Sequence, residues 1–118
     1  SVQAGNWEQA KASTIAAALI SENPDLKALL CSNDNMAIGA IAAVRQAGKG
    51  GDIHVVGFDN IKAAGELLKS GELLATVDQY GNQLAIFGIE YGLQILRDGN
   101  VPANRRTPVS LITASDLE

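Results

Sequence analysis

Three short polar segments of the sequence each pair a carboxylate with a carboxamide. They are Ser32-Asn33-Asp34, Asp59-Asn60 and Asp78-Gln79-Tyr80. A carboxylate only accepts hydrogen bonds, whereas a carboxamide both donates and accepts them. A sugar hydroxyl can do both, and its bonds to a carboxylate in a cleft are charge-assisted and therefore strong. Residues such as Asn33, Asp59 and Gln79 are thus suited to binding a neutral polyol.

Each polar segment follows a short apolar run that we predict to be a strand, namely residues 27–31, 53–58 and 73–77. Longer segments with helical spacing alternate with these strands: residues 8–22, 34–47, 61–69 and 83–97. A final strand is expected at residues 108–113. This alternation predicts an α/β fold, with a parallel sheet of about four strands and flanking helices.

The fold class predicts that the three polar segments form one site. In an open α/β sheet, ligands bind outside the carboxyl ends of the strands. Asn33, Asp59 and Gln79 occupy equivalent places after successive strands, so their side chains are expected to converge on one rim.

Each of these residues also has a purely structural interpretation. Asn33 or Asp34 could cap the helix that follows, and Asp59 or Asn60 could do the same for the next helix. Gln79 could be a solvated loop residue. We assign Asp34 to the helix start and Asn33 to the ligand. Trp7 either packs against the protein or offers its aromatic face to a sugar ring.

Composition argues against several other functions. The net charge is −4 and the basic residues are scattered, which disfavours nucleic-acid binding. One cysteine and one histidine cannot form a zinc cluster, and Cys31 is expected to be a small buried residue. No glycine-rich phosphate loop follows a strand, and His54 lies within a predicted strand. We therefore expect no catalytic residue, no metal and no cofactor.

The motifs resemble a known family. "SNDNMAIGAIAAVRQAGKGGDIHVVGFDN", followed by "SGELLATVDQ", is similar to the C-terminal part of periplasmic sugar-binding proteins of ABC importers, of the ribose-binding type. The resemblance extends over nearly the whole chain. It implies a monosaccharide ligand, a pentose or a hexose, bound by Asn33, Asp59, Gln79 and a stacking Trp7. It also implies a periplasmic or extracytoplasmic location and an ABC permease as partner.

Sugar-responsive transcription regulators of the lactose-repressor type share the ND-x-MA-x-G and VGFD elements of these segments but not the AT-x-x-Q element. The effector-binding core of such a repressor is therefore the alternative. Members of the binding-protein family have two lobes. The resemblance assigns residues 1–80 to the later part of the C-terminal lobe. It assigns residues 81–118 to a hinge crossing, a helix and a final strand. The chain is therefore expected to be a fragment that binds sugar weakly or not at all by itself and that self-associates.

Overall fold

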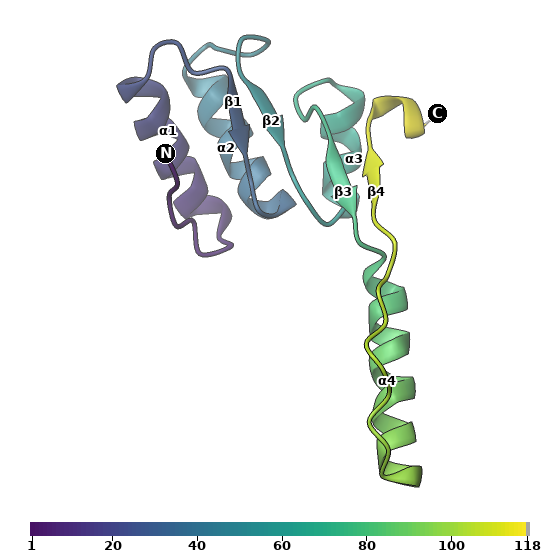
Figure 1. The fold of residues 1–118 in the computed structure, drawn as a ribbon. Coiled ribbons are helices and arrows are strands. Elements are labelled where there is room, and N and C mark those ends of the chain that lie inside the picture. The colour runs from purple at the N-terminus through teal and green to yellow at the C-terminus, as the bar shows by residue number, and fades with distance from the viewer. Residues whose placement is uncertain (118) are drawn as a thin grey trace.

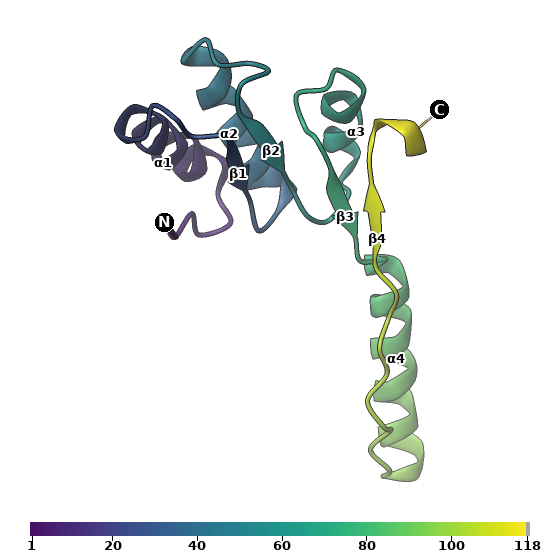
Figure 2. The same cartoon turned by 45° about the horizontal axis from the view of Figure 1, so that its top comes forward.

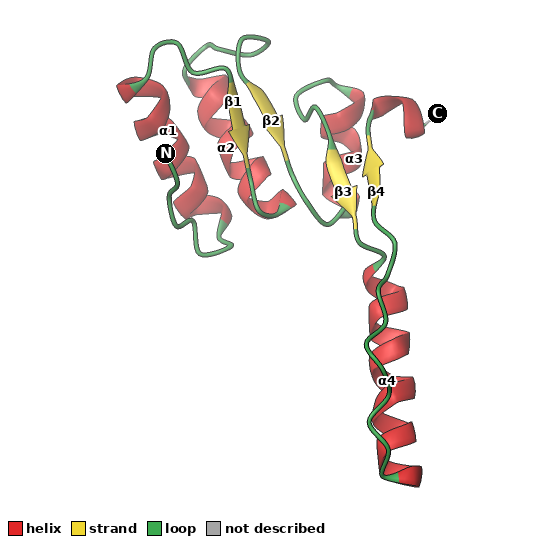
Figure 3. Ribbon diagram, viewed as in Figure 1, coloured by secondary structure: helices red, strands yellow, loops and turns green. Residues whose placement is uncertain are grey.

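A computed structural model describes residues 1–117, and helices and strands alternate in it as predicted (Figure 1 and Figure 3). The elements are α1 (Gln9–Glu22), β1 (Ala28–Leu30), α2 (Asp34–Gln46), β2 (His54–Val56), α3 (Lys62–Lys69), β3 (Thr76–Asp78), α4 (Gly81–Asp98), β4 (Ser110–Ile112) and a short 3-10 helix, η1 (Ala114–Asp116). The predicted α/β class is confirmed, and the helices begin within two residues of the predicted positions.

The strands lie in the order β1-β2-β3-β4. Strand β1 pairs in parallel with β2, and Leu29 lies opposite Val55. A parallel bridge between Val56 and Ala75 then links β2 to the chain that enters β3, supported by a hydrogen bond from the Gly57 amide to the Ala75 carbonyl over 3.0 Å. The last strand differs from the prediction, because β4 runs antiparallel to β3. A parallel partner would require the chain to cross back over the sheet, whereas β4 arrives directly from the far end of α4.

Helices α2 and α3 both lie behind the strands in the view of Figure 1, and the turned view of Figure 2 agrees. Each strand directs alternate side chains toward these helices. Leu29 and Val55 consequently join the buried core with Ile41 and Val44 of α2 and Leu68 of α3. The opposite face of the strands is open to solvent. Its large apolar side chains include Leu30, which is 81% exposed, Leu74 and Leu111.

Helix α1 packs closely on α2 because small residues form the contact. Ala12, Ala16 and Ile20 are spaced by four residues and make a buried stripe along α1. A Cβ atom added to Gly39 of α2 would lie 2.1 Å from the Gln9 carbonyl oxygen. Only glycine permits this approach, which brings the first residue of α1 against the middle of α2.

Helix α4 projects away from the sheet and the other helices, and it has no buried residue (Figure 1). The chain returns toward β4 along its side. Two contacts hold the returning segment to the helix. The Arg105 guanidinium lies 3.7 Å from the centre of the Phe87 ring, and the Tyr91 hydroxyl donates to the Ala103 carbonyl over 3.2 Å. Large apolar side chains of α4 remain exposed, among them Ile86, Ile89, Leu93 and Leu96.

Candidate functional site

The ends of β1, β2 and β3 and the loop before α1 all lie at one edge of the molecule, the lower edge of the sheet in Figure 1. A hydrogen bond ties the first two ends together, because the amide of Asp34 donates to the carbonyl of Phe58 over 2.8 Å. The amide of Asp59 in turn donates to the Val77 carbonyl over 2.8 Å. The backbone therefore presents the three polar segments side by side.

Asn33 is the N-cap of α2. Its backbone is extended, and its side-chain oxygen accepts a hydrogen bond from the Met36 amide over 2.8 Å. Sequence reasoning named Asn33 or Asp34 as the cap and favoured Asp34, as part of the helix start. The helix does begin at Asp34, but the cap is made by Asn33. Only the amide oxygen is used, so the Asn33 nitrogen remains able to donate to a ligand at the rim.

Asp59 and Gln79 lie in direct contact. The Gln79 amide nitrogen donates to Oδ1 of Asp59 over 2.6 Å, and both side chains are half-buried. This bond fixes the direction of both groups. Oδ2 of Asp59 and the amide oxygen of Gln79 stay available as acceptors. The pair can thus receive hydrogen bonds from two neighbouring hydroxyl groups of one ligand.

The loops that carry this pair adopt uncommon backbone conformations. Asp59, Asn60 and Tyr80 have φ values of 108°, 51° and 52°. Residues other than glycine are rare at positive φ, and each such position costs on the order of 1 kcal/mol or more. Strain of this kind persists only where surrounding contacts hold it, and it often accompanies a binding site.

Asp34 is the buried anchor behind the rim. Its side chain is fully buried, and it accepts hydrogen bonds from the Thr76 hydroxyl over 2.7 Å and from the Ile61 amide over 2.9 Å. One carboxylate therefore joins the start of α2, the start of α3 and strand β3. Gly57 must be glycine here, because an added Cβ would lie 2.1 Å from Oδ1 of Asp34.

Trp7 lies at the same edge, in the loop that leads into α1. Its side chain is 65% exposed, and its φ is 64°. Trp7 is therefore not buried in the core, although packing against the protein was one of its two interpretations. Much of the Trp7 side chain is therefore accessible to solvent in the loop before α1.

The electrostatic character of this part of the rim suits a neutral ligand. Asp59 and Asp78 bring carboxylates to it and Asp34 lies buried behind them, whereas the salt bridges among residues 1–117 pair Arg45 with Glu72 and Lys69 with Glu66. An anionic ligand would be repelled.

Within residues 1–117, no group of three His, Cys, Asp or Glu side chains could hold a metal ion, and no helix is both long and apolar enough to span a membrane.

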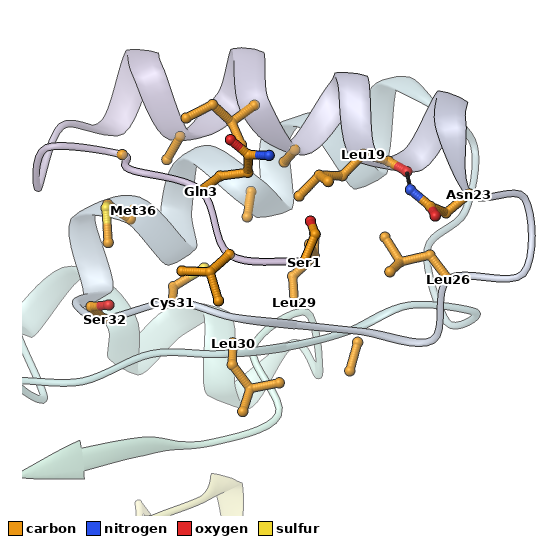
Figure 4. Close-up of a pocket in the computed structure, with 17 residues that line it drawn as sticks. Ser1, Gln3, Leu19, Asn23, Leu26, Leu29, Leu30, Cys31, Ser32 and Met36 are labelled. Atoms are coloured by element: carbon orange, nitrogen blue, oxygen red, sulfur yellow. Dashed lines mark hydrogen bonds between the residues drawn. The ribbon is translucent and has the colours of Figure 1, made fainter.

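A separate groove of about 410 Å³ lies between α1 and β1 (Figure 4). Its lining is mainly apolar and includes Leu19, Leu26 and Leu29, and the chain near Ser1 runs through it. Cys31 borders this groove and is half-buried. Burial, together with the negative charge of Asp34, raises the pKa of the Cys31 thiol to about 11, so the thiol is protonated and unreactive at neutral pH.

Comparison with known proteins identifies the family of this chain. The sequence pattern of the periplasmic binding protein domain matches residues 1–100. The chain belongs to the periplasmic binding protein family. Among curated members of this family, the D-ribose/D-allose-binding protein of Pseudomonas aeruginosa is 49% identical over 119 aligned positions, which cover 97% of this chain and 37% of that protein. The D-allose-binding periplasmic protein of Escherichia coli is 35% identical over 84% of this chain and 32% of its own length.

Solved structures of the family share the fold. An ABC transporter solute-binding protein from Burkholderia multivorans is 51% identical, with a TM-score of 0.86 over 92% of this chain and 39% of that one. A second, from Actinobacillus succinogenes with bound D-allose, is 30% identical, with a TM-score of 0.88 over 96% of this chain and 40% of that one. The chain thus spans well under half the length of the periplasmic binding proteins it matches.

Sequence reasoning did not identify the residues that support the rim on which Asn33, Asp59 and Gln79 lie. Thr76 is a single hydroxyl residue in an otherwise apolar run, and it lies buried against the Asp34 carboxylate. The Asn60 side chain donates to Oδ2 of Asp78 over 3.1 Å, and the Tyr80 hydroxyl lies 2.8 Å from Oγ of Ser110. Asn60 and Asp78 stood out as polar residues after strands, but strand positions alone do not show which of them face each other.

Proposed function

We propose that the whole protein containing this chain binds a monosaccharide, a ribose-like pentose or a hexose, as the solute-binding component of a bacterial ABC sugar importer. The observation that carries the proposal is the contact between Asp59 and Gln79 beside the Asn33 cap. It groups a carboxylate and two carboxamides at the carboxyl ends of parallel strands, where α/β proteins bind ligands.

The proposed roles follow from the hydrogen-bonding capacity of each group. Asp59 accepts from ligand hydroxyls through Oδ2, while Gln79 holds the carboxylate in place and accepts through its amide oxygen. Asn33 donates through its amide nitrogen, since its oxygen caps α2. Trp7, whose indole is exposed, stacks on the apolar C–H face of the sugar ring.

We further propose that this chain contributes one wall of a cleft between two lobes. Residues 1–80 would belong to the sugar-binding lobe, whereas residues 81–118 cross the hinge and return. The projection of α4 beyond the sheet supports this division, because the helix has no buried residue. Closure of the lobes on the sugar would signal loading to the ABC permease. One wall alone should bind sugar weakly, since tight binding requires burial of most of the ligand surface.

The names of the relatives support transport over gene regulation. They are a D-ribose/D-allose-binding protein and a D-allose-binding periplasmic protein, and the solved relatives are solute-binding proteins of ABC transporters. None of these four is an enzyme or a transcription regulator. We therefore propose a periplasmic or extracytoplasmic location, and we do not favour the repressor alternative.

A ligand screen tests this proposal. The intact protein should be titrated calorimetrically with D-ribose, D-allose, D-fucose, D-galactose and myo-inositol, with D-ribose 5-phosphate as an anionic control. At least one neutral sugar should bind with a dissociation constant in the micromolar range or below, and the phosphate ester should not bind. Preference for the phosphate ester, or the absence of binding to every neutral compound, would contradict the proposal.

A further inference from the structure

Asp78, at the end of β3, accepts hydrogen bonds from both loops that carry the candidate ligand residues. Its Oδ1 accepts from the Tyr80 amide over 2.7 Å, and its Oδ2 accepts from the Asn60 side-chain nitrogen over 3.1 Å. One carboxylate thus bridges the loop after β2 and the turn after β3. Both of its oxygens are occupied by the protein itself, so Asp78 differs from Asp59, which keeps one oxygen unused by these contacts.

Both donors have uncommon backbone conformations that such hydrogen bonds help to hold. Asn60 and Tyr80 adopt φ values of 51° and 52°, a left-handed conformation that L-residues seldom hold without partners. Asn60 directly follows Asp59, and Tyr80 directly follows Gln79. The backbone amide of Asn60 has only a long contact of 3.3 Å to the Thr76 hydroxyl, so the bond from its side chain to Asp78 is the shorter restraint.

We infer that Asp78 is a positioning residue for the sugar site. Its hydrogen bonds to Asn60 and Tyr80, here called the clamp, keep Nε2 of Gln79 within 2.6 Å of Oδ1 of Asp59. The inference rests on the proposed function, in which Asp59 and Gln79 bind the sugar. Tyr80 also contacts strand β4, because its hydroxyl lies 2.8 Å from Oγ of Ser110, the first residue of that strand. Asp78 therefore acts through its neighbours and need not touch the ligand.

Two substitutions in the intact protein separate the clamp from other roles. Asp78→Ala removes both hydrogen bonds. Asp78→Asn keeps the acceptor for the Tyr80 amide, and its new amide group can donate to Asn60 once the Asn60 side chain rotates. Asp25→Ala is the matched control, because Asp25 is an exposed carboxylate in the turn before β1. For each variant, the dissociation constant of the best-bound neutral sugar and the unfolding temperature without sugar should be measured.

The clamp predicts that Asp78→Ala weakens sugar binding roughly tenfold or more, that Asp78→Asn restores it to within about threefold, and that Asp25→Ala has no effect. A crystal structure of sugar-free Asp78→Ala should show that Asp59 and Gln79 have moved beyond hydrogen-bond distance. If Asp78→Ala does not fold, Asn60→Ala removes the Asn60 bond alone and should also weaken binding.

Each contrary result identifies what has failed. If the unmodified protein binds sugar and Asp78→Ala binds it equally well, the inference is overturned and the proposed function stands. Equal losses in Asp78→Ala and Asp78→Asn would mean that the carboxylate itself contacts the ligand, which also overturns it. If the unmodified protein binds no neutral sugar, the proposed function fails and the inference fails with it.

Discussion

The Gln79 side chain donates a hydrogen bond to the Asp59 carboxylate over 2.6 Å, although 20 residues separate the two along the chain. The contact exists because β2 and β3 end side by side at the same edge of the sheet. It gives the carboxylate a fixed direction before any ligand arrives. A group oriented in advance loses less conformational freedom on binding, which favours affinity.

Replacement of Asp59 by alanine should therefore weaken sugar binding by the intact protein strongly. The substitution removes the charge-assisted acceptor and leaves both Gln79 and the ligand hydroxyls without their partner. We expect a loss of about 2–4 kcal/mol in binding free energy, measured by titration calorimetry. Asp52→Ala, which removes an exposed carboxylate before β2, is the control and should bind as the unmodified protein does. An unchanged dissociation constant for Asp59→Ala would remove Asp59 from the site.

Replacement of Gly57 by alanine should destabilise the protein, because the new methyl group would overlap the buried Asp34 carboxylate. Relief of the overlap would disturb the hydrogen bonds of Asp34 to Thr76 and Ile61. A loss of about 1–3 kcal/mol in the free energy of unfolding is expected in urea titrations.

Gly65 is the matched control for this substitution. It lies within α3, and an added methyl group would meet no atom within 4 Å. Gly65→Ala should therefore increase stability by about 0.5–1 kcal/mol, since alanine favours the helix. Equal effects of the two substitutions would show that the space around Gly57 is not restricted.

The Cys31 thiol should make stability fall with rising pH in the alkaline range. Burial and the charge of Asp34 raise its pKa from 9.0 to about 11 in the folded chain. The unfolded chain releases this proton first, so the contribution of Cys31 is complete below pH 9 and is lost as pH rises through 11. Unfolding midpoints measured across this range should decline less steeply in Cys31→Ala. Identical slopes for the two proteins would show that the folded environment does not perturb the thiol.

The 118-residue chain by itself should self-associate at tens of micromolar. Helix α4 exposes a row of large apolar side chains, and the open face of the sheet adds Leu30. Association would remove this apolar surface from water. Sedimentation velocity should show dimers or larger species that are reduced by Ile89→Lys with Leu93→Lys. Gln83→Lys, an exposed polar position of α4, should leave association unchanged. A strictly monomeric profile for the unmodified chain would disprove this expectation.

Much of the fold follows from the sequence because its elements are short and locally specified. The alternation of apolar runs with helical segments predicted the α/β class. The strand-end rule then placed Asn33, Asp59 and Gln79 at one edge, where their segments lie in the structure. The contact between Asp59 and Gln79 follows the same logic, since neighbouring parallel strands bring equivalent positions together.

Other features depend on long-range contacts that a linear pattern does not contain. The buried role of Asp34 arises because Thr76, 42 residues away, lies opposite it. The antiparallel direction of β4 depends on the path of the chain around α4, which spacing does not determine. The positive φ value of Tyr80 is likewise imposed by neighbouring segments, because a tyrosine seldom adopts that conformation by itself.

A crystal structure of the intact protein with the best-bound neutral sugar of the screen would test the central claim most directly. We predict that the Asn33 amide nitrogen, an oxygen of Asp59 and the Gln79 amide oxygen lie about 2.6–3.2 Å from hydroxyl oxygens of one sugar ring. The Trp7 indole should lie against the apolar face of the same ring. A sugar bound elsewhere, with Asn33, Asp59 and Gln79 all facing solvent, would contradict the account.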